Sequence, residues 1–202
     1  PNIIGFKHCG IGIYSERMFM NRITSNYMED INRAVFIGNA YCQLSVSDNI
    51  LYVNRRGIEL AYCSPMTTPP PGTTDPAINI IGNSIELGTN TSNNSPFSKG
   101  FYMYEAPGNT DPADAYMYLN QIGVTVGLYG YHFQNVHNSF LTYCNSNLGF
   151  NGRQFGIKLE TCRDITMQCS GHQTPVPLYT SNQPEHYGSF VRGSRDCVWD
   201  CN

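Results

Sequence analysis

The chain has 202 residues, which is enough for one continuous core, and only 13% of them are charged. The formal net charge of −3, with 12 Lys and Arg, argues against nucleic acid or an anionic membrane surface as partner. No apolar run reaches the roughly 18 residues that a membrane-spanning helix needs, so no membrane insertion is expected.

Short strand-like segments recur along the chain, each opened by a Gly or Ala. A unit of about 22 to 30 residues cannot bury its own apolar face, so successive units must stack on one another. Together with the abundance of Gly and Tyr, this pattern predicts an all-β solenoid of about seven turns. The predicted openings are Gly12, Ala34, Gly57, Gly100, Gly130, Gly156 and Gly188.

Each opening residue precedes alternating large apolar and mostly polar residues, as expected for a strand with one buried face. A second strand follows after a turn, most clearly at 44–47, 140–143 and 165–168. Asn and Gly after these second strands indicate turns, because both tolerate left-handed backbone. No segment shows a convincing helical period, and residues 27–35 are the only candidate for one.

Three segments are predicted to leave the stack as loops, near 64–99, 106–120 and 172–186. The first contains three consecutive prolines, which a sheet interior excludes, but 78–81 and 84–87 within it read as strands of the repeat. Loops on a rigid solenoid are where binding residues usually lie. We interpret 1–202 as a single solenoid segment, and Pro1 as a sign that it is part of a longer or processed chain.

The eight cysteines have two interpretations. As a disulfide framework, they would indicate a secreted or virion-surface protein. Alternatively, Cys144, Cys169 and Cys201 follow their opening glycines at similar distances, and stacked cysteines behave as small apolar residues. We expect these three to be buried, unpaired thiols. No cysteine spacing fits zinc, and no metal or other cofactor is predicted.

The segments 130–144, 156–169 and, more loosely, 188–201 resemble the turns of a right-handed parallel β-helix, as in phage tailspikes and the pectate-lyase-like superfamily. The resemblance implies a virion-tail or extracellular homotrimer that binds, and often cuts, a bacterial surface polysaccharide. A non-catalytic structural or adhesive β-helix, such as a fibre shaft or secreted adhesin, is the alternative. A disulfide-stabilised extracellular glycoprotein domain is the third.

The predicted register places two columns of side chains on the outside of the solenoid, two and four residues after each opening. Aromatic rings there would stack on sugars, and polar groups would bind hydroxyls. An outward sheet face that is only solvated, or that contacts another subunit, fits equally. The predicted glycan-binding residues are Glu59, Tyr102, Tyr104, His132, Gln134 and Lys158.

Cleavage by hydrolysis would require two carboxyl groups, at roughly 6.5–9.5 Å for an inverting enzyme. Glu105 and Glu160 lie two turns apart, about 9.6 Å by stacking, and Asp111 is a further candidate carboxylate. A lyase would instead need a base and a cation, for which His132, Lys158 and Tyr102 are candidates. Surface acids and bases without catalytic function are the alternative to both.

Overall fold

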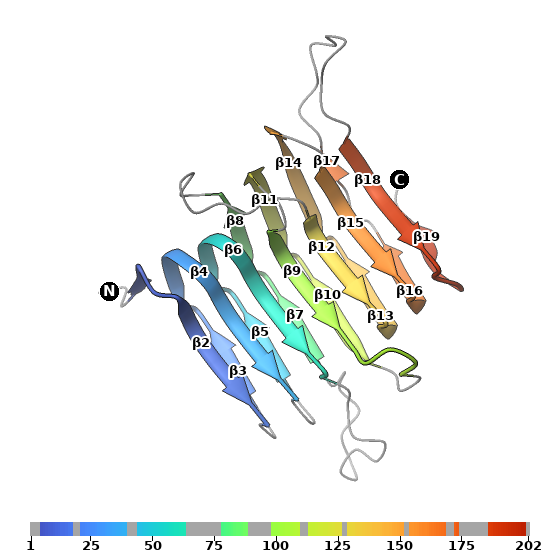
Figure 1. The fold of residues 1–202 in the computed structure, drawn as a ribbon, viewed down its shortest axis with the longest axis horizontal. Coiled ribbons are helices and arrows are strands. Elements are labelled where there is room, and N and C mark those ends of the chain that lie inside the picture. The colour runs from blue at the N-terminus through green and yellow to red at the C-terminus, as the bar shows by residue number, and fades with distance from the viewer. Residues whose placement is uncertain are drawn as a thin grey trace.

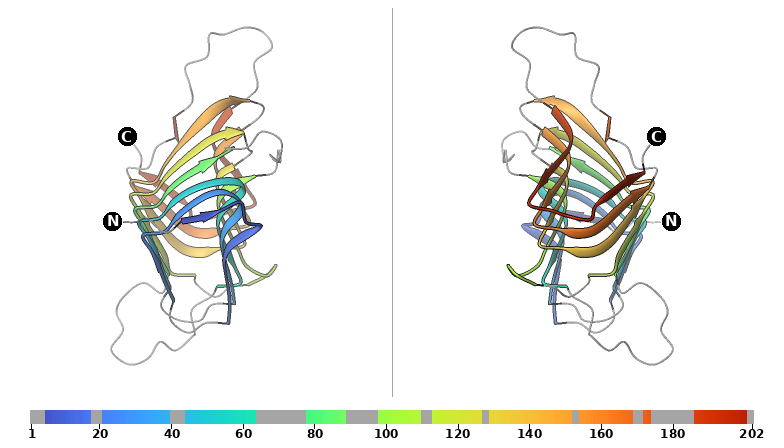
Figure 2. Two further views of the ribbon diagram at one scale, coloured as in Figure 1. Left: turned by 90° about the vertical axis from the view of Figure 1, so that its left-hand side faces the viewer. Right: turned by 90° about the vertical axis from the view of Figure 1, so that its right-hand side faces the viewer.

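The fold is seen in a computed structural model that describes residues 5–17, 21–39, 44–63, 78–88, 98–109, 113–126, 129–151, 154–168, 172–173 and 186–200. These residues form nineteen β-strands and no helix, so none of them is in a helix that could cross a membrane. All described strand pairs are parallel, and the strands coil in successive turns about one axis (Figures 1 and 2). The prediction of an all-β fold with parallel strands is confirmed, and the way in which the sheets curl round the axis is compatible with the predicted solenoid.

Each turn contributes strands to three faces of the solenoid. The first face holds β2 (Ile11–Glu16), the second halves of β4 (Tyr27–Gly38) and β6 (Ile50–Ala61), β9 (Lys99–Tyr104), β12 (Tyr129–Gln134), β15 (Gln154–Glu160) and β18 (His186–Arg192). The second holds β3 (Asn21–Thr24), β5 (Leu44–Ser47), β7 (Ile78–Ile81), β10 (Ala115–Tyr118), β13 (His137–Thr142), β16 (Arg163–Gln168) and β19 (Val198–Asp200). The third holds β1 (Gly5–Lys7), the first halves of β4 and β6, β8 (Ser84–Leu87), β11 (Gln121–Val126), β14 (Asn145–Asn151) and β17 (His172–Gln173).

The strand register confirms the predicted repeat. Ile13, Val35 and Ile58 pair in line, and the column continues through Phe101, Tyr131 and Ile157. From Val35 to Ile157 these side chains are buried in one continuous core. Equivalent residues of neighbouring turns therefore pack on each other at the strand spacing of about 4.8 Å.

The opening Gly or Ala is required by the corner between the third and first faces. A Cβ on Gly57 would lie 2.4 Å from the backbone oxygen of Gly100 and 2.6 Å from Ile85. A Cβ on Gly100 would lie 2.3 Å from Ile122. The corner therefore admits only the smallest side chains, which explains why this position repeats in the sequence.

A buried asparagine ladder runs along the corner between the second and third faces. Asn49 Nδ2 donates to Asn83 Oδ1 at 2.8 Å, and Asn83 Nδ2 donates to Asn120 Oδ1 at 3.0 Å. The amides of Asn49, Asn83 and Asn120 each also donate to a backbone oxygen of the preceding turn, as Asn83 does to Val46 at 2.9 Å. Asn26 extends the ladder at one end by donating to Asn49. The ladder satisfies polar backbone groups that the corner buries.

The turns that the sequence predicted after the second strands are present, for example after β5 and β7. The left-handed residue is the one before each asparagine, as in Asp48 with φ 56° and Gly82 with φ 65°. The single left-handed residue turns the chain, and the following side chain consequently points inward. Cys144 occupies the next such position, where burial raises the pKa of its thiol.

Other local predictions have mixed outcomes. Residues 27–35 belong to strand β4 and not to a helix: Met28, Ile31 and Ala34 are buried three residues apart because the register of the strand shifts between Glu29 and Arg33. The strands expected at 78–81 and 84–87 are present, but the predicted loop 106–120 is shorter, because 115–118 is strand β10. Cys144 is buried as predicted, whereas Cys169, Cys201 and the loop segments 64–77, 89–97 and 174–185 lie outside the described residues.

Candidate functional site

The first face carries the two outward columns that the sequence predicted. Strand pairing aligns Tyr102 with His132 and Lys158, and aligns Tyr104 with Gln134 and Glu160. The full columns are Tyr14, Phe36, Glu59, Tyr102, His132, Lys158, Phe190 and Glu16, Gly38, Ala61, Tyr104, Gln134, Glu160, Arg192. We call the outer surface of these strands the aromatic–ionic face.

A third column on this face was not recognised from the sequence. It consists of the residues directly before the opening Gly or Ala, and its middle part is Arg33, Arg56, Lys99, Tyr129 and Phe155. The first three are cations on successive turns. The sequence signal was readable, because Arg-Ala, Arg-Gly and Lys-Gly occur at three consecutive openings.

Several predicted surface side chains are outward but buried. Glu59 is 2% exposed, His132 4% and Tyr102 9%. Their neighbours on the outer surface cover them: the Tyr102 ring stacks on Tyr104 at 4.6 Å and on His132 at 4.9 Å between centroids. The alternation of the strand predicts which way a side chain points, and the packing of long side chains over each other then removes it from solvent.

Glu59 is enclosed by two arginines of the third column. Arg33 Nε lies 2.9 Å from its carboxylate, and Arg56 forms a second ion pair with it. The same arginines also cover aromatic rings, with Arg33 5.1 Å from the Phe36 centroid and Arg56 5.1 Å from that of Tyr102. Each oxygen of the Glu59 carboxylate thus faces an arginine, and the one that faces Arg33 is within ion-pair distance without forming a hydrogen bond.

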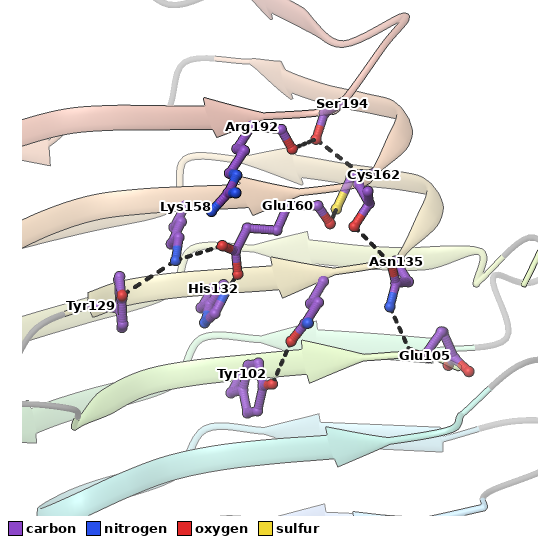
Figure 3. Close-up of polar contacts among 12 residues, drawn as sticks. Tyr102, Glu105, Tyr129, His132, Asn135, Lys158, Glu160, Cys162, Arg192 and Ser194 are labelled. Atoms are coloured by element: carbon purple, nitrogen blue, oxygen red, sulfur yellow. Dashed lines mark hydrogen bonds and ion pairs between the residues drawn. The ribbon is translucent and has the colours of Figure 1, made fainter. Parts of the chain in front are cut away.

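A second network joins β12 and β15 (Figure 3). One oxygen of Glu160 lies 2.8 Å from His132 Nε2 and the other 2.8 Å from Lys158 Nζ. Lys158 Nζ also donates to the Tyr129 hydroxyl at 3.3 Å. In addition, the Tyr102 hydroxyl donates to Gln134 Oε1 at 2.8 Å. Four predicted glycan-binding residues therefore contact one another or Glu160.

The charge states of this network follow from burial and partners. Burial favours the neutral form of Glu160, but hydrogen bonds from Lys158 and His132 outweigh it and lower its pKa. Burial, with the charge of Lys99 next, lowers the pKa of His132 to about 3. The imidazole is therefore neutral at neutral pH, and Nε2–H donates to Glu160. Its Nδ1 is then an acceptor, and it is buried without a hydrogen-bond partner among the described residues.

Lys99 lies between the two networks. Its Nζ is 3.2 Å from the centroid of the Tyr102 ring and 5.6 Å from that of Tyr129. The residue is only 9% exposed. Burial, followed by repulsion from Arg56, lowers its pKa to about 7.

Glu105 and Glu160, the two proposed catalytic carboxylates that the structure describes, lie at different register positions. Glu105 is buried directly after β9, and its side chain extends away from the Glu160 carboxylate (Figure 3). Glu105 aligns with Asn135 of the next turn, one residue past the position that Glu160 occupies on its own strand. Glu105 and Glu160 are two turns apart. Asp111 lies outside the described residues.

Within the described ranges, no cluster of three or more His, Cys, Asp or Glu side chains is arranged to hold a metal ion. The chain matches no protein-family model, no curated protein and no solved structure. Function must therefore be inferred from the geometry of the aromatic–ionic face itself.

Proposed function

We propose that the aromatic–ionic face binds an extended bacterial surface polysaccharide, as the receptor-binding segment of a homotrimeric tailspike-like virion protein. The observation that carries this proposal is the partly exposed group of Tyr104, Gln134, Lys158 and Glu160, which spans three successive turns. A repeating surface of this kind suits a repeating ligand.

The chemistry of these side chains fits sugar rings. Tyr104 is backed by Tyr102, so its ring is held as a rigid platform for the apolar face of a sugar. Gln134, Lys158 and Glu160 offer donors and acceptors for hydroxyl groups beside it. Because Lys158 and Glu160 are already fixed by each other, a ligand would meet pre-oriented polar groups, which reduces the entropy lost on binding.

Cleavage of the bound glycan is a second step of the proposal, and Glu160 is the residue that the charges favour for it. Its lowered pKa keeps it ionised, which suits a base or nucleophile and not a general acid. Hydrolysis would need a second carboxyl group near it, and the Glu105 side chain extends away from it (Figure 3). Binding is therefore better supported than cleavage.

A non-catalytic β-helix shaft or adhesin is the alternative function. It is favoured by the way in which the outer side chains satisfy one another, with Glu59 held by Arg33 and Arg56. Ion pairs and stacked rings of this kind also stabilise the contacts between turns. The two functions differ in one measurable respect, since only the first requires a ligand.

Replacing Tyr104 with alanine should weaken glycan binding several-fold while leaving the fold intact, because a stacking aromatic contributes about 1 kcal/mol beyond its buried area. Binding would be measured by calorimetry with a glycan selected from a panel of capsules and O-antigens. Tyr143→Ala is the matched control, since Tyr143 is an exposed tyrosine beside the second face. Equal affinities in both variants would move the binding site elsewhere.

Replacing Glu160 with glutamine should lower the rate of glycan cleavage by about 10²-fold or more if Glu160 is the base or nucleophile. The amide keeps the size of the side chain and one acceptor for Lys158, so binding should remain. Release of reducing ends would be followed for both proteins, and the absorbance of unsaturated uronate would separate elimination from hydrolysis. A wild-type protein that binds but releases no product would support the non-catalytic alternative.

A further inference from the structure

The three lysines of the chain differ in their partners. Lys7 lies 2.6 Å from Glu29, and Lys158 lies 2.8 Å from Glu160. Lys99 is the most buried of them, yet within the described part of the chain its ammonium has no ion pair. Burying a cation without a counter-ion lowers the stability of the fold, so the presence of Lys99 at this position calls for an explanation.

The carboxylates nearest to Lys99 are held by other cations. Glu59 is paired with Arg33 and Arg56, and Glu160 with Lys158. His132 is neutral and adds no charge. The group around Lys99 therefore has two carboxylates, Glu59 and Glu160, and four cations, which are Arg33, Arg56, Lys99 and Lys158. The local surplus of positive charge is available to an anion from outside the chain.

His132 provides a second, independent observation. Its side chain is 5% exposed, and Nδ1 is buried without a hydrogen-bond partner among the described residues. The imidazole packs on the same two rings as the Lys99 ammonium, at 4.9 Å from Tyr102 and 4.8 Å from Tyr129. The Lys99 ammonium, which has no counter-ion among the described residues, and His132 Nδ1, which has no donor there, therefore both lie beside the rings of Tyr102 and Tyr129.

We propose that Lys99 is the carboxylate-binding residue of a subsite for a uronic acid, whose neighbouring hydroxyl donates to His132 Nδ1. This inference rests on the proposed glycan-binding function and specifies an acidic polysaccharide. A carboxylate beside hydroxyl groups on a ring with an apolar face matches the cation, the acceptor and the tyrosine rings together. A simple oxyanion would satisfy only the first of these.

The subsite should bind most tightly below pH 7 and more weakly as pH rises through that value, because Lys99 then loses its proton. The other charged or titratable groups around it are Arg56, Glu59, Tyr102, Tyr129, His132, Lys158 and Glu160. Burial raises the pKa of Tyr102 to about 12, and the pKa of His132 is about 3, so neither changes charge across this range. A bound carboxylate should in turn raise the pKa of Lys99.

The test is a titration of protein labelled with ¹³C-lysine, in which three lysine Hε–Cε signals report directly on Lys7, Lys99 and Lys158. Glucuronate at millimolar concentration should shift the Lys99 signal saturably and raise its pKa, whereas glucose should not. Lys99→Met should abolish saturable glucuronate binding, and Lys7→Met is the matched control that should retain it. His132→Gln should reduce the preference for glucuronate over acetate.

The remaining outcomes separate this inference from the proposed function. No saturable effect of glucuronate on Lys99 would overturn the subsite, and so would an equal effect of acetate or inorganic sulfate. If a polysaccharide binds equally before and after reduction of its carboxyl groups, the uronic acid assignment fails while glycan binding stands. If glucuronate binds at Lys99 but Tyr104→Ala leaves every polysaccharide affinity unchanged, the subsite stands and the proposed extended site fails.

Discussion

Replacing Lys99 with methionine should raise the free energy of unfolding below pH 7, although it removes a side chain that makes aromatic contacts. The lowering of the Lys99 pKa from 10.5 to about 7 corresponds to an unfavourable energy on the order of 5 kcal/mol for the buried ammonium. Loss of the contact with Tyr102 offsets part of the gain, so we expect a net increase of about 2–4 kcal/mol.

The same substitution should change the pH dependence of stability. The unfolded chain keeps its lysine proton up to about pH 10.5, whereas folded Lys99 loses it near pH 7. The unfolded state therefore binds more protons in this interval, and wild-type stability should rise with pH across it. Urea unfolding at a series of pH values would measure the difference between the two proteins. A Lys99→Met protein that is less stable than wild type throughout would show that the ammonium is stabilised by its surroundings.

Replacing Asn83 with alanine should lower the free energy of unfolding by several kcal/mol. Asn83 is buried, and its side chain accepts from Asn49 and donates to Asn120 and to the backbone of Val46. The substitution leaves buried groups on both neighbouring turns without their partners, at about 1–3 kcal/mol for each. The expected loss is therefore far larger than that of a surface substitution.

Asn147→Ala is the matched control for the ladder, because Asn147 is an exposed asparagine on β14. It should change stability by no more than about 0.5 kcal/mol. Unfolding of both variants would be followed by circular dichroism in urea. Similar stabilities for Asn83→Ala and Asn147→Ala would show that the ladder contributes little to the fold.

The register of the solenoid could be predicted because two physical constraints repeat in the sequence. The corner that excludes a Cβ at Gly57 and Gly100 marks each opening, and the core requires an apolar residue directly after it. These constraints place the same type of residue at the same position of each turn, so they can be recognised in the sequence alone. They were sufficient to align Ile58 with Phe101 across a long insertion.

The asparagine ladder and the burial of the outer face could not be predicted in the same way. Asparagine is common in turns for its backbone conformation, so Asn49 and Asn83 carried no sign that their amides bond to each other. Similarly, the burial of His132 and Lys99 depends on rings from neighbouring turns, and the alternation within one strand gives no measure of it. The linear pattern therefore does not determine which side chains of neighbouring turns bond to or cover one another.

The asparagine ladder also has a consequence for how this chain tolerates change in length. The amide-to-amide hydrogen bonds all run in the same direction along the axis, from Asn26 through Asn49 and Asn83 to Asn120. A one-residue insertion in β7, between Asn49 and Asn83, would displace the donor of one turn from the acceptor of the next and would invert the facing of the strand. The number of residues between successive ladder asparagines is therefore a constraint on the fold. We expect a one-residue insertion or deletion there to lower stability more than a substitution does.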